Sequence, residues 1–201
     1  MTQISIFDYG AGNIHSLRKA IATGARNVSV ESDIRLALNA DILVLPGVGA
    51  FGTAASAMRG EQDRVRTALA DGKPCLGVCL GMQLLFDDSE EAPGAGLGLI
   101  PGGVRRLRTA KVPHIGWNDV EWADAGGLAG ANISTAYFAN AYVCEPDDPS
   151  PILAWTTHQT SRFPSVVRVA NTVGVQFHPE KSSAAGLAFV NNVIDELAQC
   201  R

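Results

Sequence analysis

The sequence predicts an α/β protein with a parallel sheet at its core and an antiparallel insertion in its second half. Strand-like and helix-like segments alternate as far as residue 86, and the strand-like ones are short, continuous apolar runs. Such runs are typical of parallel strands buried on both faces. Residues 104–173 instead hold several short β-type runs in succession, which favours antiparallel pairing. The length of 201 residues suits one domain, so we expect residues 1–201 to fold together.

The first half of the chain supplies the alternating elements. Strands are expected at residues 4–7, 28–30, 41–45 and 75–78. Helices are expected at residues 14–25, 50–70 and 80–86, with a break in the second near Gly60. In the first of these helices Ile14, Leu17 and Ile21 have the spacing of one buried face. A strand followed by a helix, repeated, is the order of a parallel α/β unit.

The second half begins with a loop at residues 87–103, which is rich in acidic residues, Gly and Pro. Antiparallel strands are expected at residues 119–122, 135–143, 152–156 and 165–169, and a last buried strand at residues 174–177. A final helix should begin after Ser182-Ser183, because either serine can cap it. Its apolar stripe should pack on the sheet and consists of Leu187, Val190, Ile194 and Leu197.

Composition and charge argue against several classes of protein. The net charge of −4, the pI near 5.5 and the absence of a basic stripe argue against nucleic-acid or anionic-membrane partners. Apolar runs are about eight residues or fewer, well short of the 18 or more that a membrane span needs. The four cysteines lack paired or Cys/His spacing, so we expect neither a metal nor a cofactor. No signal-peptide pattern opens the chain, and we therefore expect a reduced, cytoplasmic protein.

The strongest chemical signal is the sequence Gly77-Val78-Cys79-Leu80-Gly81, between an expected strand and an expected helix. A nucleophile on so sharp a turn is held exposed, and glycine two residues away on either side lets strand and helix approach. The N-terminus of the helix favours a thiolate at Cys79. The backbone N–H of Leu80 can point at an oxyanion. We therefore expect Cys79 to be a nucleophile, and Cys75 inside the strand to be a core residue.

A second signal follows the expected strand at residues 174–177, where His178 is separated from Glu180 by one proline. A cysteine nucleophile needs a base that takes and returns a proton, and the base needs an acceptor that fixes its tautomer. His178 and Glu180 supply both parts. The other three histidines lack a carboxylate at this spacing after a buried strand.

A third loop, Pro46–Gly52, matches the glycine-rich pattern of dinucleotide-binding proteins. That pattern requires an acidic residue at the end of the next strand, and here Cys79 stands in that place. We therefore expect the loop instead to give a second backbone N–H, from Val48 or nearby, to an oxyanion hole.

Several blocks of sequence resemble a known family. GVCLGMQ from Gly77 and GVQFHPEKS from Gly174 are similar to the motifs of the triad, or class I, glutamine amidotransferases. Further blocks resemble the glutaminase subunits of imidazole glycerol phosphate synthase, of histidine biosynthesis: DYGAGN from Asp8, PGVGAFG from Pro46, SEE from Ser89, GLGLIPG from Gly96 and HIGWN from His114. The resemblance runs from residue 8 to residue 182 and so covers nearly the whole chain.

This resemblance implies a flavodoxin-like open sheet with helices on both faces and a thioester mechanism. Cys79 would attack the carboxamide of glutamine, His178 would protonate the departing ammonia, and water would release glutamate. The residues implied to hold glutamine are Gly49, Gln83, Glu91 and main-chain groups of Ala141 and Tyr142. The family usually carries a His and a small hydroxyl residue where this chain has Asn140 and Ala141.

The family also implies a partner. Ammonia would travel to a separate (β/α)₈ cyclase subunit, which makes imidazole glycerol phosphate and an aminoimidazole carboxamide ribotide. The sequence contains no phosphate-binding loop, which agrees with an ammonia acceptor bound elsewhere. The residues that match family positions at the subunit contact are Asn13, Tyr137 and Lys181.

Two alternatives remain open at this point. The chain could be a triad glutaminase that serves a different synthase, or a non-catalytic binding protein on the same fold. The DYGAGN and PGVGAF blocks speak against the first, and the intact Cys79, His178 and Glu180 speak against the second.

Overall fold

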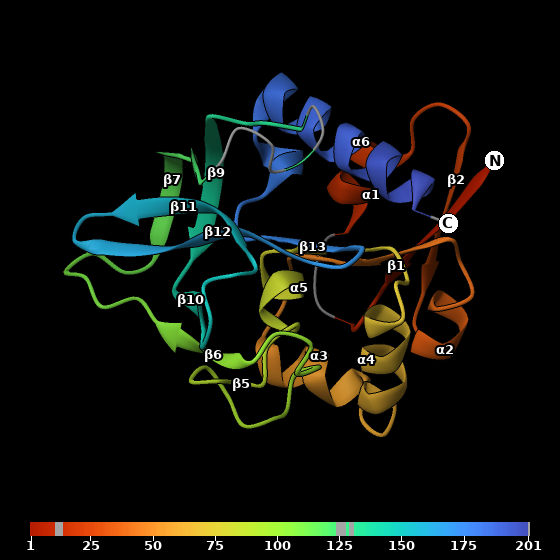
Figure 1. Cartoon of the computed structure of the whole chain (residues 1–201), viewed down its shortest axis with the longest axis horizontal. Helices are drawn as coiled ribbons and strands as arrows, with labels where there is room; N and C mark the ends of the chain where they lie inside the picture. The colour runs from red at the N-terminus through yellow and green to blue at the C-terminus, as the bar shows by residue number, and fades with distance from the viewer. Residues whose placement is uncertain (11–13, 124–127, 129–130, 201) are drawn as a thin grey trace.

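An eight-stranded mixed sheet forms the centre of the computed structural model, which describes residues 1–10, 14–123, 128 and 131–200 (Figure 1). Its strand order is β2-β1-β3-β4-β13-β12-β11-β8. The five strands from β2 to β13 are parallel, and the remaining three are antiparallel. The strands of this sheet are β1 (Thr2–Phe7), β2 (Arg26–Glu31), β3 (Ile42–Leu45), β4 (Cys75–Val78), β8 (Glu121–Trp122), β11 (Ile152–His158), β12 (Ser161–Val169) and β13 (Thr172–Val175).

The parallel strands follow the order 2-1-3-4-5, if β13 is counted as the fifth. This order is that of flavodoxin-like folds, in which ligands bind outside the carboxyl ends of the strands. The predicted α/β class with a mostly parallel core and an antiparallel insertion is confirmed. Two smaller sheets complete the insertion: β10 (Tyr142–Pro146), β6 (Gly102–Arg106) and β5 (Asp88–Ser89) form one, and β7 (His114–Asp119) and β9 (Thr135–Asn140) form the other.

Helices cover both faces of the large sheet (Figure 1). On one face lie α1 (His15–Ile21) and α6 (Ser183–Gln199), and on the other lie α3 (Phe51–Ala57), α4 (Gln62–Ala70) and α5 (Leu80–Gln83), while the short α2 (Ile34–Ala37) lies beside β1 and β2. Alternate strand residues face opposite sides. Val44 accordingly packs with α1 and α6, whereas Leu43 and Leu45 pack with α3 to α5. The core therefore has two apolar layers, one on each side of the sheet.

Two expected helices are shorter than predicted. The first ends at Ile21 instead of residue 25. The third ends at Gln83, since the backbone N–H groups of Leu85 and Phe86 bond to the carbonyls three residues back, on Met82 and Gln83, instead of four. The break predicted near Gly60 is confirmed, since α3 and α4 are separate and Gly60 has φ of +84°. Positive φ is a conformation that glycine adopts without steric cost.

The final helix begins where expected, but two details of the prediction are wrong. Leu187 is 41% exposed, whereas Val190, Ile194 and Leu197 are buried as predicted. Ser182 occupies the cap position without capping the helix. Its hydroxyl donates a hydrogen bond to the His178 carbonyl (2.7 Å) and accepts one from the Tyr137 N–H (2.9 Å).

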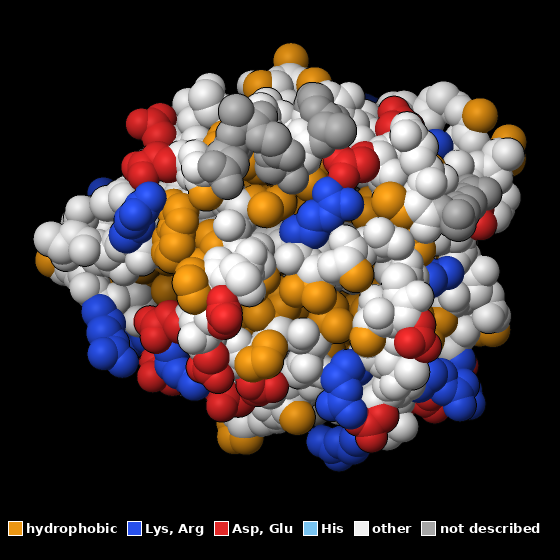
Figure 2. Space-filling view, viewed as in Figure 1, with side chains coloured by type: hydrophobic (Ala, Val, Ile, Leu, Met, Phe, Trp, Pro, Cys, Tyr) orange, Lys and Arg blue, Asp and Glu red, His pale blue; other side chains and the backbone are white. Residues whose placement is uncertain are grey.

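The β-strands of the second half were predicted in part. The runs at residues 119–122, 152–156 and 165–169 lie in or beside β8, β11 and β12, and the run at residues 135–143 divides at Ala141 into β9 and β10. The strands β6 and β7 were missed, because glycines interrupt both, including Gly116 at φ of +135°. Within the described residues, no helix has the length and apolar character to span a bilayer. On the face shown in Figure 2, basic side chains lie among acidic ones.

Candidate active site

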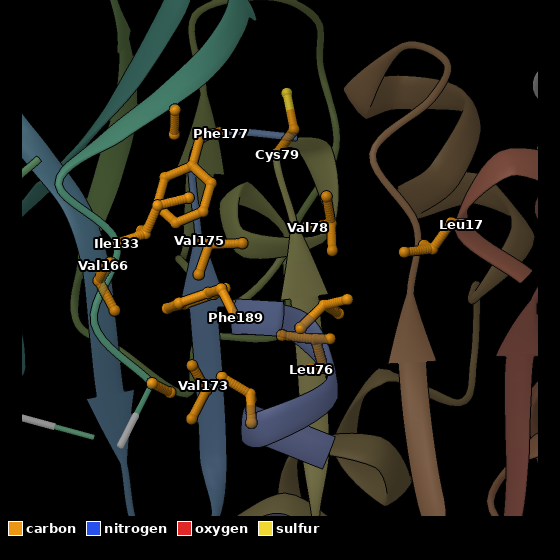
Figure 3. Packing of buried hydrophobic residues seen from close by; sticks show 14 of the residues in the cluster. Leu17, Leu76, Val78, Cys79, Ile133, Val166, Val173, Val175, Phe177 and Phe189 are labelled. Atoms are coloured by element: carbon orange, nitrogen blue, oxygen red, sulfur yellow. The ribbon is translucent and has the colours of Figure 1, made fainter. Parts of the chain in front are cut away.

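Cys79 lies directly after β4, at the carboxyl end of the parallel strands, and its backbone is strained, with φ of +46° and ψ of −103°. The flanking glycines are required by close packing. A Cβ on Gly81 would lie 2.0 Å from the Leu45 carbonyl oxygen, and one on Gly77 would lie 2.6 Å from the Gly81 oxygen. Figure 3 shows the sulfur of Cys79 directed away from the packed apolar side chains of Leu76 and Val78. The predicted sharp turn is therefore present.

His178 and Glu180 follow β13, the strand that lies next to β4 in the sheet. Glu180 belongs to a short 3₁₀ turn, Pro179–Lys181, and its Oε1 lies 2.8 Å from Nδ1 of His178. Both side chains are buried. Burial lowers the pKa of His178, but hydrogen bonds with Cys79 and Glu180 and the charges of both outweigh it and raise this pKa to about 10. The structure thus brings Cys79, His178 and Glu180 together and favours a protonated imidazole between them.

A cavity of about 150 Å³ opens beside Cys79. Its lining includes Leu80 and all five residues expected to hold glutamine. The full lining is Gly47, Gly49, Cys79, Leu80, Gln83, Glu91, Ala139, Asn140, Ala141 and Tyr142. A larger hollow of about 350 Å³, between residues 99–101 and 148–151, contains none of the expected site residues. The small cavity is therefore the candidate substrate site.

Several polar groups around this cavity already have partners inside the protein. Glu91 accepts a hydrogen bond from the Phe51 N–H (2.9 Å), at the first turn of α3. The Ala141 carbonyl accepts one from the Leu107 N–H (2.9 Å). The Tyr142 carbonyl accepts two, from Nε2 of Gln83 (3.2 Å) and Nδ2 of Asn140 (3.0 Å). These bonds fix the walls of the cavity, and a ligand would have to share or complement them.

The loop after β3 approaches the nucleophile closely. A Cβ on Gly47 would lie 3.0 Å from Cβ of Cys79 and from Cε1 of His178, so a side chain here would press on both catalytic side chains. Gly49 has φ of +102° and lines the cavity. Val48, expected to give an amide to the oxyanion, is half-buried and is not among the lining residues.

The sequence alone did not single out Tyr9, which holds this loop. Its hydroxyl donates a hydrogen bond to the Pro46 carbonyl, and the residue is buried. Burial, followed by the negative charges of Cys79 and Asp8, raises the pKa of Tyr9 well above its usual value. The phenol therefore stays protonated and remains a donor to the loop. Its position two residues after β1, across from the end of β3, could have suggested this contact.

Two of the three residues expected at a subunit contact, Tyr137 and Lys181, lie near the triad. The backbone carbonyl of Tyr137 on β9 accepts a hydrogen bond from the His178 N–H (2.9 Å), and Lys181 is exposed two residues after Pro179. Asn13 lies outside the described residues. Beside Tyr137, on β7, Ile115 and Trp117 are 62% and 53% exposed. This apolar face was not foreseen, although two large apolar residues at i and i+2 of a strand are the pattern that would produce it.

Two histidines to which we assigned no chemistry, His114 and His158, stack on one another. His114 is buried and stacks between Phe138 and His158, with ring centroids 4.9 and 4.1 Å away. Burial, and then the neighbouring His158, lowers the pKa of His114 to about 4. Among the described residues, no cluster of three His, Cys, Asp or Glu side chains could hold a metal ion.

Comparison with known proteins identifies the family. The family model described as "Glutamine amidotransferase class-I" matches residues 5–196. The chain is 47% identical to "Imidazole glycerol phosphate synthase subunit HisH" of Symbiobacterium thermophilum over 198 residues, which are 96% of this chain and 93% of that one. It is 44% identical to the protein of the same name from Thermus thermophilus, over 92% of this chain and 93% of that one.

Solved structures agree at the level of the fold. A structure described as "Crystal structure of glutamine amidotransferase" superposes with a TM-score of 0.75 at 19% identity and covers 99% of this chain and 100% of its own. PurLQS from Thermotoga maritima superposes with a TM-score of 0.74 at 16% identity and covers 97% and 99% of the two chains. The chain therefore belongs to the class I glutamine amidotransferases and, within them, to the family of HisH subunits of imidazole glycerol phosphate synthase.

Proposed function

We propose that this chain hydrolyses glutamine to glutamate and ammonia through a Cys79–His178–Glu180 triad and a thioester on Cys79. The observation that carries the proposal is the geometry at the end of β4 and β13. A strained cysteine shares a hydrogen bond with a buried histidine, and that histidine is held by a carboxylate 2.8 Å away. A cysteine nucleophile requires this arrangement.

The reaction has two halves. The sulfur of Cys79 forms a bond to the carboxamide carbon, and the electron pair of the C=O bond moves to the oxygen, where the N–H of Leu80 donates to it. As the C–N bond breaks, His178 gives its proton to the nitrogen, and ammonia leaves. Water then attacks the thioester, His178 takes up the water's proton, and glutamate departs as the thiolate is restored. Glu180 keeps the imidazole in one tautomer throughout.

The cavity beside Cys79 would hold the amino-acid part of glutamine. Glu91 would face the α-ammonium, and Gly49, Gln83 and the main chain at residues 141–142 would surround the backbone groups. The loop of residues 46–49 would supply the second oxyanion donor, from Val48, once an amide turns inward. Gly47 and Gly49 make such a turn inexpensive, because glycine tolerates positive φ.

The ammonia would pass to a (β/α)₈ cyclase subunit, which produces imidazole glycerol phosphate and aminoimidazole carboxamide ribotide in histidine biosynthesis, in the cytoplasm. The names of the relatives, which are subunits of imidazole glycerol phosphate synthase, support this partner. The exposed Ile115 and Trp117 beside Tyr137 support a docking face next to the triad, and the exposed Lys181 follows the triad residue Glu180 directly. Exposed apolar patches rimmed by polar residues are typical of interaction sites.

The experiment that tests the proposal measures glutamate release from glutamine by the wild-type chain with a cognate cyclase subunit and its ribulosyl ligand. We expect strong release only in the loaded complex and none with Cys79→Ala. Release that does not depend on the cyclase would keep the triad chemistry and assign the chain to another synthase. The absence of release in every condition would overturn the proposed activity.

A further inference from the structure

Two buried glutamines lie behind the nucleophile. Gln176 is fully buried, and Gln83 is 5% exposed. The register of the sheet explains their position. Val78 of β4 pairs with Val175 of β13, so the next residue on each strand, Cys79 and Gln176, stand opposite one another. Nε2 of Gln176 lies 3.4 Å from Sγ of Cys79.

The orientation of the Gln176 amide follows from a chain of contacts. Nε2 of Gln83 is 3.2 Å from the Tyr142 carbonyl oxygen, and a backbone carbonyl can only accept a hydrogen bond. The atom of Gln83 at this contact must therefore be the nitrogen. The same nitrogen lies 3.3 Å from the side-chain amide of Gln176, which must present its oxygen there. The NH₂ group of Gln176 is thereby left facing the sulfur.

We propose that Gln176 is a further catalytic residue, whose side-chain N–H donates to Sγ of Cys79 and stabilises the thiolate, and that Gln83 is the residue that positions it. This inference rests on the proposed role of Cys79 as nucleophile. Charge on sulfur is present before the attack and returns when water displaces the thioester, so the donor acts at both ends of the cycle. An amide does not titrate, and Gln176 therefore supports the thiolate without competing with His178 for the proton.

The same contacts limit how Gln83 meets the substrate. Both hydrogens of its NH₂ group are used, one on Tyr142 and one on Gln176. Only its Oε1 is left for a ligand, so Gln83 would accept a hydrogen bond from glutamine and would not donate one. One glutamine side chain thus takes part both in substrate binding and in the orientation of the group behind the nucleophile.

The test compares the wild-type chain with Gln176→Met, a side chain of similar length that has no donor. Alkylation of Cys79 by iodoacetamide is followed across pH, and the Cys79 peptide is quantified by mass spectrometry. Cys200, part-exposed and distant in the sequence, is the internal control in each sample. We expect the pH midpoint of Cys79 alkylation to rise by about one unit, as loss of a hydrogen bond to a charged group implies, while the Cys200 rate stays unchanged.

A second variant separates the chain of contacts from a merely structural role. Gln83→Met leaves Gln176 in place but frees its amide to rotate, so the midpoint should shift in the same direction by a smaller amount. Adding Gln83→Met to Gln176→Met should produce no further shift, because the effect passes through Gln176. Gln83→Met also supplies the test if Gln176→Met does not fold.

An unchanged midpoint in a folded Gln176→Met chain, or in Gln83→Met alone where the first variant does not fold, would overturn the inference. So would an additive effect of the two substitutions. These outcomes are independent of the glutaminase assay. If the wild-type chain releases glutamate but the substitutions do not shift the midpoint, only the role of Gln176 is overturned. If the substitutions shift the midpoint but the wild-type chain releases no glutamate, the proposed function is overturned.

Discussion

The turns that follow β3 and β4 lie side by side at the end of the sheet, and Gly49 in the one and Gly81 in the other are glycines for different reasons. After β4, the glycines are required by contact, since a Cβ on Gly81 would lie 2.0 Å from a backbone oxygen of β3. After β3, Gly49 is exposed and has φ of +102°, and the loop is held by the hydroxyl of Tyr9. The turn after β4 is locked by backbone packing, and the turn after β3 is restrained by the side chain of Tyr9. This contrast suits a fixed nucleophile beside an adjustable oxyanion donor.

The largest expected effect comes from Gly81→Ala, which tests the locked turn. The added methyl group would overlap the Leu45 carbonyl, so the free energy of unfolding should fall by about 3 kcal/mol or more. Urea denaturation followed by circular dichroism measures it. Gly60→Ala is the control, because it adds the same methyl group to a glycine but meets no atom within 4 Å, and its positive φ should cost about 1 kcal/mol. Equal losses in the two variants would remove the contact argument.

Gly49→Ala tests the adjustable loop. A side chain disfavours positive φ at this position, so the inward turn of an amide should become costly while the substrate cavity stays intact. We expect kcat of the cyclase-bound chain to fall by about 10- to 100-fold with little change in KM, while the positive φ lowers the free energy of unfolding by about 1 kcal/mol, as at Gly60. Steady-state glutamate release measures both constants. A loss confined to KM would contradict the proposed loop movement.

The two turns also differ in their bond to His178, because only the turn after β4 shares a side-chain hydrogen bond with it, through Cys79. The folded state raises the pKa of His178 from its usual value near 6.5 to about 10. The stability that this provides is complete below pH 6.5 and is lost as the pH rises through about 10, because the folded chain then gives up its extra proton. Glu180→Gln should move this loss to lower pH and reduce the unfolding free energy at pH 8 by about 1–2 kcal/mol. Superimposable stability–pH curves for the two chains would show that Glu180 does not hold the proton.

Tyr9→Phe should have the smallest effect. It removes only the hydroxyl that holds the Pro46 carbonyl and keeps the ring, which packs edge-on against Phe7. One buried hydrogen bond contributes about 1 kcal/mol, so kcat should change by a few-fold and the unfolding free energy by a similar small amount. Kinetics of the cyclase-bound chain and urea denaturation measure the two quantities. A loss as large as that of Gly49→Ala would mean that Tyr9, and not glycine, governs the loop.

The parts of the fold that depend on local pattern could be predicted from the sequence, and those that depend on pairing could not. The sharp turn at Cys79 was predicted because glycine stands two residues away on either side, and β3 and β4 were predicted as continuous apolar runs. The contact between Gln176 and Cys79 depends on the register of β4 with β13, which no local pattern contains. Leu187 was misplaced because the first turn of α6 packs closely against residues 179–182 through Gly186, where a Cβ would lie 2.2 Å from the Pro179 oxygen.

The backbone of β9 at Tyr137 is tied to the catalytic segment by two hydrogen bonds, one from the His178 N–H and one to the Ser182 hydroxyl, which itself donates to the His178 carbonyl. Both peptide groups of His178 are therefore anchored, directly or through one hydroxyl, to a strand whose neighbour carries the exposed Trp117. A sideways displacement of β9 must either carry the main chain of His178 with it or break one of these bonds. A displacement of the two-stranded β7–β9 sheet is thus passed to the main chain of His178 without passing through the eight-stranded sheet.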